Sequence, residues 1–415
     1  MFSGLPLTLL SLLATHVARY ISPAATHPRV IALWFLLLTG LAHAAHLDTR
    51  SSSTGVQSYP NGSTFVWTVE DTYKGPDFFN YFHFYTGPDP TNGLVNYTDQ
   101  ETAFADGLAY VTSDNIVVMK GDNTTWLAEG ENRNSVRVSS YKQYNTGKRF
   151  RYKFMALSTI ALPDAGLFIL DLDMAPWGCA VWPAWWTLGG GEWPYTGEID
   201  IIEGVHDNEH NQVTWHTGPN CNLTQNATFT GTIVETNGQP DLDCDGNTNN
   251  NAGCGVVEWS RASYGPIFDQ QGGGIFAMMW DLSGIGVWSF YRAAIPQDVL
   301  DGQPTPSTWG EPVAFLEPAE CNPLTNFINH SIVFDITFCG DWAGNSYATS
   351  GCPGTCPERL LDPSNFDNAS WRINTLTVYR QQTLDGEVTT SAGQRRELHW
   401  TLALGAAIMA GLALT

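Results

Sequence analysis

Residues 197–205 read GEIDIIEGV, a run of branched apolar residues that carries three acids. Isoleucine favours strands because its branched side chain suits a pleated surface. Alternation along a strand places Glu198 and Asp200 on one face and the isoleucine between them on the other. Glu203 would point the opposite way unless one extra residue, a β-bulge near Ile201–Ile202, restores its side. The stretch therefore predicts a bulged strand with three carboxyls on one face.

Short strands of this kind recur along the chain. The 415 residues include 40 glycines and 23 prolines, and 12% of the residues are aromatic. Aromatic and β-branched runs between turn residues favour an all-β sandwich or barrel. Neither an internal repeat nor a Pro/Ser-rich linker divides the middle, so one domain over roughly 46–385 is the simplest interpretation. The runs include STFVWTV, FFNYFHFY, NIVVM, SVRVSS, LFILDLDM, IFAMMW, SIVFDITF and INTLTVYR.

The charge balance narrows the partners. The formal net charge is −22, and only 14% of the residues are charged. Binding to nucleic acid or to an acidic membrane surface needs clustered lysine and arginine, which this composition does not favour. An acidic, polar surface instead suits a secreted protein that handles a neutral ligand.

The cysteines and the glycosylation sequons support an oxidising compartment. All eight cysteines lie between residues 179 and 356, and an even number in a secreted chain predicts disulfides, with the pairing left open. Cys352 and Cys356 could also form half of a metal knuckle, but no matching second pair exists, so disulfides are preferred. Glycan acceptors are predicted at Asn61, Asn96, Asn123, Asn222, Asn226, Asn329 and Asn368.

The amino-terminal end, residues 1–45, has the features of a signal region. Residues 30–44 (VIALWFLLLTGLAHA) are apolar and end in the small-x-small pattern of a cleavage site. We expect cleavage after Ala44. An earlier apolar run at residues 5–14 is a second candidate for the signal, and a retained signal-anchor is the alternative.

The carboxy-terminal end, residues 386–415, has the layout of a glycosylphosphatidylinositol (GPI) attachment signal. Small residues at 391–393 precede a polar spacer at 394–399 and an apolar tail at 400–415. A retained tail anchor and an artefact of the sequence are the alternatives. Together, the two ends predict a secreted protein that is tethered to the cell surface, and this anchor is the only membrane contact we expect.

Tryptophans crowd the segment before the acids. Trp182, Trp185, Trp186 and Trp193 lie within VWPAWWTLGGGEWP, next to a run of glycines. Sugar rings have flat C–H faces that stack on indole, while their hydroxyls need polar partners nearby. The cluster favours an open aromatic cleft beside the acids. Buried core tryptophans next to a solvated acidic strand are the alternative.

The spacing of the two glutamates suits glycosidic chemistry. Strand geometry puts the α-carbons of Glu198 and Glu203 roughly 13 Å apart. Side chains that lean together can narrow the carboxyl separation to the roughly 5–5.5 Å of a retaining glycosidase. One carboxylate would attack the anomeric carbon, and the other would protonate the leaving oxygen. Asp200, between them, would help to keep one glutamate protonated.

These motifs also resemble a known family. GEIDIIEGV, with WPAWWTLGG before it and NQVTWHTGPNC after it, is similar to family 16 glycoside hydrolases of the fungal endo-1,3(4)-β-glucanase (laminarinase-like) branch. The likeness covers nearly all of residues 58–380. It implies a concanavalin A-like β-jelly-roll sandwich of two antiparallel sheets with a concave substrate cleft. It also implies hydrolysis of internal linkages of β-1,3- and mixed-linkage β-1,3/1,4-glucans with retention. We expect a monomer that uses no cofactor or metal, because no acidic loop indicates the calcium site known in parts of the family.

The resemblance assigns roles to individual residues. Glu198 would be the nucleophile, Glu203 the acid/base and Asp200 the supporting aspartate, with His216 near the acids. Four positions have a plainer alternative. These are a core histidine for His216, a turn cap for Asn80, a surface ion pair for Arg133 and packing beside a disulfide for Trp342. The positions that would line the glucan cleft are Asn80, Arg133, Trp186, Trp193 and Trp342.

Other functions and one departure stay open at this point. A cell-wall glucan transglycosylase is the first alternative, although such relatives more often have an unbulged Glu-x-Asp-x-Glu. A non-catalytic β-glucan-binding protein is the second, although relatives of that kind typically lose one glutamate. Residues 148–165, with four basic residues within six positions, interrupt the likeness. They are either a translated retained intron or a genuine basic loop.

Overall fold

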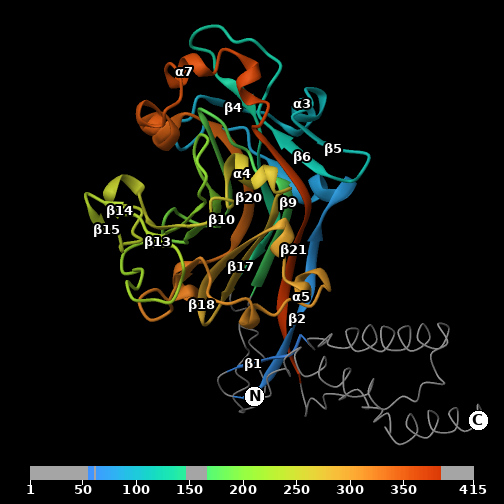
Figure 1. Cartoon of the computed structure of the whole chain (residues 1–415), viewed down its shortest axis with the longest axis vertical. Coiled ribbons are helices and arrows are strands. Elements are labelled where there is room, and N and C mark those ends of the chain that lie inside the picture. Colours follow the sequence, from blue (N-terminus) through green and yellow to red (C-terminus); the bar gives the residue numbers. More distant parts are fainter. Residues whose placement is uncertain (1–54, 60–61, 146–165, 385–415) are drawn as a thin grey trace, which may run out of the picture. The chain divides into compact units, whose positions relative to one another are not determined.

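Two large sheets stacked face to face form the framework of the protein, seen here in a computed structural model (Figure 1). The structure describes residues 55–59, 62–145 and 166–384. All strand pairs within these two sheets are antiparallel, which confirms the predicted all-β sandwich. Strands β2 and β21, far apart in sequence, run side by side in the first sheet (Figure 1).

Sheet A has nine strands. Its spatial order is β1 (Gln57–Ser58), β2 (Thr64–Tyr73), β21 (Ser370–Leu384), β9 (Gly166–Met174), β17 (Gly274–Asp281), β18 (Gly284–Tyr291) and β19 (Ala314–Leu316), with β6 (Val117–Lys120) on β21 and β5 (Ala109–Val111) on β6.

Sheet B has eight strands and carries the acidic motif. Its order is β13 (Thr232–Ile233), β16 (Cys254–Val257), β12 (Gln212–His216), β11 (Glu198–Glu203), β10 (Val181–Gly189), β20 (His330–Phe338), β8 (Arg137–Tyr144) and β3 (Phe82–Phe84). Two small sheets pair β4 (Val95–Tyr97) with β7 (Arg133–Ser135) and β14 (Glu235–Thr236) with β15 (Gln239–Pro240).

Helices are short and lie in the connections. The α-helices are α3 (Gln100–Ala105), α4 (Gly265–Gln270), α5 (Gln297–Leu300), α6 (Pro323–Asn326) and α7 (Cys356–Arg359). The 3-10 turns are η2 (Gly75–Tyr81), η3 (Asn249–Asn251), η4 (Arg292–Ala294), η5 (Pro306–Thr308), η7 (Tyr347–Thr349) and η8 (Pro363–Phe366), and η6 (Gly340–Gly344) is a π-helical turn. Within the described ranges, no helix is long and apolar enough to cross a membrane.

The core fills the space between the sheets. Alternation directs Phe168 and Leu170 of β9 and Phe334 of β20 into it. Trp185 is also part of this core, with 0% exposure and its ring stacked on Phe334 at 6.2 Å. The expectation that all four clustered tryptophans line an open cleft is therefore wrong for Trp185. Its neighbour Trp186 points to the opposite face of the sheet because the side-chain period of a strand is two.

The outer faces of the two sheets differ. Sheet A has an apolar patch on its outer face, and Val299 of α5 and Trp309 pack over it. Sheet B has a smaller patch of Ala184, Trp186 and Val333 on its outer face, which also carries the three acids of β11. The apolar patch of sheet A consists of Phe65, Trp67, Leu167, Ile169, Ile275, Ala277 and Tyr379.

Four disulfides tie the loops to the sheets, as the cysteine count predicted. Cys352 and Cys356 bond to different partners, so the metal-knuckle alternative does not apply. The pairs are Cys179–Cys352, Cys221–Cys321, Cys244–Cys254 and Cys339–Cys356.

Some expectations fall on residues outside the described part of the chain. The predicted signal region, the GPI attachment signal and the insertion at 148–165 all lie there. Strand β8 of sheet B precedes that insertion, and β9 of sheet A follows it. Among the described sequons, Asn96, Asn226, Asn329 and Asn368 are exposed, and glycosylation itself stays a prediction.

Candidate active site

The three acids of β11 lie on one face of sheet B. Glu198, Asp200 and Glu203 pair with every second residue of β10, and the register shifts by one residue between Asp200 and Ile202. Ile201 is the extra residue. Because residues opposite one another in a sheet share a face, all three carboxyls point away from the core. The bulge predicted from the sequence is therefore confirmed. We call this outer surface of sheet B the acid face.

A buried asparagine holds the bulge in shape. Asn211, which is fully buried, accepts a hydrogen bond from the main-chain N–H of Glu203 (2.9 Å). Its amide N–H donates to the carbonyl of Ile201 (2.9 Å). A bulge leaves such main-chain groups without ladder partners, and burying them unpaired is costly. Asn211 thus fixes the backbone that aims Glu203. The sequence analysis gave Asn211 no role, although it is the first residue of the NQVTWHTGPNC motif.

Glu198 has an indole and an imidazole beside it. The Nε1–H of Trp193 donates to Oε2 of Glu198 (2.9 Å), and Nε2 of His216 lies 3.9 Å from Oε1. His216 stands opposite Glu198 in the β11–β12 ladder. Burial and then the nearby Asp200 raise the pKa of Glu198 from 4.5 to about 7, against the opposing effects of His216 and Trp193. The structure therefore brings both predicted neighbours to Glu198.

Glu203 has its own indole donor. The Nε1–H of Trp182 donates to Oε1 of Glu203 at 2.9 Å. Trp342, on η6, packs edge-on against Trp182 with ring centroids 5.9 Å apart. Burial and then Asp200 hold the pKa of Glu203 well above its ordinary value. Trp342 thus connects to Glu203 through Trp182, and its place along the glucan cleft stays a prediction.

Asp200 lies between the two glutamates and is the most deeply buried of the three acids. It is 3% exposed, and its Oδ2 lies 3.4 Å from Nε2 of His216. Burial and then the charge of Asp335 raise the pKa of Asp200 well above its usual value. Potential ligand atoms of Glu198, Asp200 and His216 lie within 4.8 Å of one another, so a divalent cation could compete with the proton here.

Two further charged residues share the acid face and were missed from the sequence. Asp335 of β20 accepts hydrogen bonds from Nε1 of Trp186 (2.9 Å) and from the hydroxyl of Tyr97 (3.2 Å). The guanidinium of Arg137 stacks over the rings of Trp186 (4.9 Å) and Tyr85 (5.0 Å). Burial raises the pKa of Asp335 to about 6. A single charge within an apolar strand, as in SIVFDITF and SVRVSS, is the signal that could have found both.

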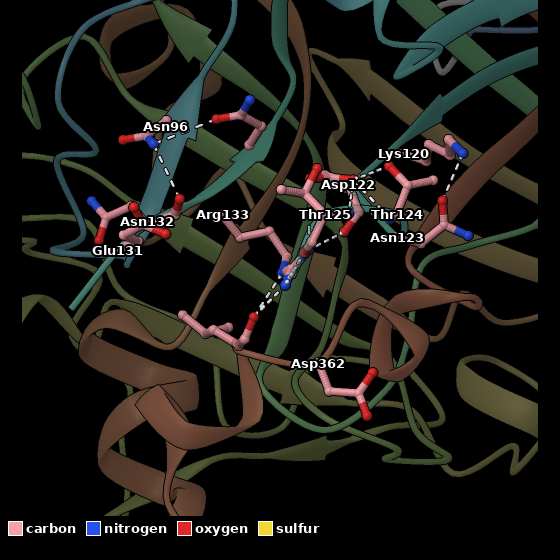
Figure 2. A network of polar contacts seen from close by, with 12 residues as sticks. Asn96, Lys120, Asp122, Asn123, Thr124, Thr125, Glu131, Asn132, Arg133 and Asp362 are labelled. Carbon is pink, nitrogen blue, oxygen red and sulfur yellow. Dashed lines mark hydrogen bonds and ion pairs between the residues drawn. The ribbon is translucent and has the colours of Figure 1, made fainter. Parts of the chain in front are cut away.

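Arg133 does not reach the acid face. It is 0% exposed and donates to the main-chain carbonyls of Asp122 (2.7 Å) and Thr125 (3.1 Å), which lie beside it in Figure 2. It also donates to the carbonyl of Leu360 (3.1 Å). Its guanidinium also lies 3.7 Å from the carboxylate of Asp122. A side chain with no exposed surface cannot line a substrate cleft, so this expectation is corrected. Arg133 instead ties loops together, and Arg137 is the arginine on the acid face.

Asn80 forms a side-chain bond within its own turn, and its place along the glucan cleft stays a prediction. It is exposed in η2, and its amide donates to Asp77 of the same turn at 3.3 Å. This local bond matches the turn-capping alternative. Trp186, by contrast, lies on the acid face, but it is only 8% exposed because Arg137 covers its ring.

Comparison with known proteins identifies the family. Residues 82–379, which are more than half of the chain, match the family model described as the XgeA-like catalytic GH16 domain. The chain belongs to glycoside hydrolase family 16. The match begins at β3 and ends within β21, so it covers all of sheet B and the strands of sheet A other than β1, β2 and the end of β21.

Curated relatives in family 16 come from several fungi. A probable glycosidase of Schizosaccharomyces pombe is 40% identical over 78% of this chain and 71% of its own length. A probable endo-1,3(4)-β-glucanase of Aspergillus niger is 38% identical over 76% of this chain and 40% of its own length. Several of these relatives are thus about twice as long as the matched part.

Solved structures place the fold among the family 16 jelly rolls. Laminarinase 16A from Phanerochaete chrysosporium, solved with two β-glucans (6-O-glucosyl-laminaritriose) in donor and acceptor sites, is 39% identical with a TM-score of 0.67. It covers 76% of this chain and 99% of its own. An elongating family 16 β-1,3-glucosyltransferase is 35% identical, with a TM-score of 0.66 over 75% of this chain and 99% of its own.

Proposed function

We propose that the protein hydrolyses internal linkages of β-1,3- and mixed-linkage β-1,3/1,4-glucans with retention of anomeric configuration. The observation that carries the proposal is the placement of Glu198 and Glu203 on one face, each with an indole N–H donor and each with a raised pKa. Relatives named endo-1,3(4)-β-glucanases and a β-glucan-bound laminarinase support this substrate class.

In the first step, the carboxylate of Glu198 attacks the anomeric carbon, and the bond from that carbon to the glycosidic oxygen breaks. Glu203 gives its proton to the departing oxygen. Burial and Asp200 raise the pKa of both glutamates, which favours the protonated form that Glu203 must have in order to donate. Trp182 then stabilises the carboxylate that the transfer leaves on Glu203.

In the second step, the same groups work in reverse. Glu203 takes a proton from a water molecule as the oxygen of that water attacks the anomeric carbon. The bond between that carbon and Glu198 breaks, which releases the carboxylate of Glu198. Trp193 and His216 stabilise the carboxylate that returns on Glu198. Asp200 raises the pKa of both glutamates, which helps Glu203 to recover its proton for the next cycle.

Digestion of laminarin tests this proposal. The wild-type protein should release oligosaccharides of several lengths, and proton NMR should show the β-anomer as the first product. Glu198→Gln should abolish release, with Asp171→Asn, on the outer face of sheet A, as the control for surface acids. First appearance of the α-anomer, or full activity of Glu198→Gln, would disprove the mechanism.

Transfer to a second sugar is the other candidate activity. The elongating β-1,3-glucosyltransferase matches this fold with 35% identity, so the scaffold is compatible with transfer as well as hydrolysis. A glycosyl–Glu198 intermediate reacts with whichever hydroxyl reaches it first. Incubation with a short β-1,3-glucan at high concentration distinguishes the two activities, because transfer yields products longer than the substrate.

We further propose that the protein is secreted and tethered to the cell surface by a GPI anchor. Four disulfides support an oxidising compartment. The signal-like run at residues 30–44 and the layout of a GPI attachment signal at residues 391–415 also support the proposal. Treatment of intact cells with phosphatidylinositol-specific phospholipase C should release the protein into the medium, and its retention by the cells would contradict the tether.

A further inference from the structure

Three of the predicted glycan acceptors, far apart in the sequence, come together where β4, β7 and the start of β21 meet. The main chain of residues 121–122 donates hydrogen bonds to Ala369 on one side (3.0 Å) and to Asn134 on the other (2.9 Å). Asn134 in turn stands opposite Asn96 in the β4–β7 pair. Three strand spacings of about 4.8 Å thus separate the outermost of these backbones by about 14 Å. We call the three acceptors the sequon cluster, and they are Asn96, Asn123 and Asn368.

Two amides of the sequon cluster are hydrogen-bonded without being fully buried. Nδ2 of Asn123 donates to the carboxylate of Asp367 (3.0 Å), and Nζ of Lys120 donates to its Oδ1 (2.7 Å). Nδ2 of Asn96 donates to the carbonyl of Asn132 (3.1 Å), and both acceptors are labelled in Figure 2. A sugar replaces one of the two hydrogens on Nδ2 and leaves the other to donate. Each amide can therefore carry a sugar and still keep its contact in the fold.

An exposed indole follows Asn123 by three residues. Trp126 is 71% exposed, the highest value for a large hydrophobic side chain in the described part of the chain. The main chain on both sides of it is tied down. Nη2 of Arg133 donates to the carbonyl of Thr125 (3.1 Å), and the N–H of Leu127 donates to the segment after α7 (3.1 Å). The backbone therefore presents this ring at a fixed place beside the acceptor.

The distance and the chemistry allow an attached sugar to reach the ring. The α-carbons of Asn123 and Trp126 are at most about 11 Å apart, a span that an oligosaccharide of several sugars covers. Sugar C–H faces stack on indole, and the exposed carboxylates of Glu129 and Glu131 in the same loop can accept hydrogen bonds from hydroxyls. A sugar that is covalently held nearby has a high effective concentration, so even a weak stacking contact is populated.

We propose that Asn123 carries an N-linked oligosaccharide that packs over the indole of Trp126. In the modification, Nδ2 loses one proton and bonds to the anomeric carbon of a lipid diphosphate-linked oligosaccharide, and the bond from that carbon to the diphosphate breaks. The inference rests on the proposed secretion, because this donor belongs to the secretory pathway, and it does not depend on glucan hydrolysis. The oligosaccharide removes the most exposed indole from contact with other molecules.

One peptide of the secreted protein reports both the modification and the contact. Trypsin cuts after Lys120 and Arg133, so residues 121–133 include both Asn123 and Trp126. Mass spectrometry should find an oligosaccharide on this peptide. Hydroxyl radicals should then label the native protein, with the sugars removed enzymatically afterwards. A sugar stacked on one of the two faces of the ring should lower oxidation of Trp126 about twofold relative to a protein without that sugar.

Variants of the sequon supply the comparison. Thr125→Val abolishes the sequon but leaves Asn123 in place, so Trp126 should become more oxidised. Thr125→Ser keeps the sequon and should behave like the wild type. Asn96→Gln and Asn368→Gln remove only the neighbouring acceptors and should leave the oxidation of Trp126 unchanged.

A second exposed indole separates a local effect from a general one. Trp259 is 69% exposed and has no sequon near it in the sequence, so its oxidation, read from a second digest, should be the same in all variants. An unmodified Asn123, or equal oxidation of Trp126 in the wild type and Thr125→Val, would overturn the inference. Secretion is scored separately by the appearance of the protein outside the cell, and glucan hydrolysis by the wild type. A secreted, active protein with a bare Asn123 would thus defeat this inference alone.

Discussion

The outer faces of the two sheets follow the same strand alternation, but they differ in the pairing of their acids. The aspartates on sheet A form ion pairs with an arginine, and the acids of β11 on sheet B do not. On sheet A, Asp171 and Asp173 form ion pairs with Arg292 at 2.6 and 3.1 Å. Asn374 donates to both of these aspartates. The neighbouring apolar patch is covered by α5 and Trp309. On sheet A, these aspartates are thus paired with a cation, and the apolar patch is covered.

The acid face of sheet B leaves its carboxyls uncompensated. Among the described residues, no lysine or arginine forms an ion pair with Glu198, Asp200 or Glu203, and the basic side chain beside Glu198 and Asp200 is the imidazole of His216. Burial then raises the pKa of each acid rather than stabilising its charge. Carboxyl groups with raised pKa values can hold and exchange protons near pH 7, as acid–base catalysis requires. The contrast shows that pairing, and not the number of acids, separates a structural face from a reactive one.

Removal of the proposed acid should have the largest effect. Glu203→Gln removes the proton that the leaving oxygen needs, so laminarin hydrolysis should fall about 10³-fold. An aryl β-glucoside oligomer, whose phenol leaves without help, should still release phenol in a first burst. Asp173→Asn on sheet A should leave both rates near those of the wild type. Equal losses on both substrates would show that Glu203 acts in some other way.

Asn211 offers the next test, because it supports the bulge and does not touch the reacting atoms. Asn211→Ala leaves two buried main-chain groups unpaired, which should cost about 3 kcal/mol of unfolding free energy. Glu203 would also lose its aim, so kcat should fall by up to about a hundredfold. Urea denaturation and initial rates measure the two effects.

Asn374→Ala on sheet A is the matched control for Asn211→Ala. Asn374 also bonds to its sheet through a side-chain amide at an irregular position of β21. Its loss should lower the free energy of unfolding without changing kcat. A comparable loss of kcat in both variants would mean that general destabilisation, and not the bulge, explains the effect.

The local patterns explain which features could be predicted from the sequence. The bulge follows from GEIDIIEGV alone, since the isoleucines must face the core and the acids must not. Parity along β10 could also have separated buried Trp185 from outward Trp182 and Trp186. Arg133 and Arg137 could not be separated in this way. They lie four residues apart, and only the break between β7 and β8 sends one into the loops and the other onto the acid face.

Long-range features could not be predicted. The disulfide partners depend on which loops meet above the sheets, and Cys179 and Cys352 are 173 residues apart. The contribution of Asn211 depends on main-chain groups that only the folded bulge exposes. Asp335 raises the pKa of Asp200 from a strand more than 130 residues away in the sequence. Sequence patterns assign a face to each residue, but they do not show which strands become neighbours.

The stability of the protein should depend on pH in a way that the acid face explains. The pKa of Glu198 is raised from 4.5 to about 7, so its stabilising contribution is complete below about pH 4.5 and is lost as pH rises through 7. Relative to Glu198→Gln, the wild type should lose up to about 3 kcal/mol of unfolding free energy over that range. Thermal or urea unfolding at several pH values measures the difference. A difference that is constant with pH would contradict the raised pKa.

The two indole donors should have the smallest and most specific effects. Trp182→Phe and Trp193→Phe keep an aromatic ring but remove the N–H that stabilises the ionised form of Glu203 or Glu198. The pKa of the affected glutamate should therefore rise. In the pH profile of kcat/KM, Trp193→Phe should move the acidic limb to higher pH, because Glu198 must ionise. Trp182→Phe should move the basic limb in the same direction, because Glu203 then keeps its proton longer.

Sheet A supplies the control for these two substitutions. Trp309 donates to Asp298 at 2.9 Å beside the apolar patch of sheet A, which is the same kind of indole–carboxylate contact. Trp309→Phe should leave both limbs of the profile in place, because neither group is near the acid face. If Trp182→Phe and Trp193→Phe instead shifted the same limb, the two glutamates would not hold separate roles. The assignment of Glu198 as nucleophile and Glu203 as acid would then have to be abandoned, even if both remained essential.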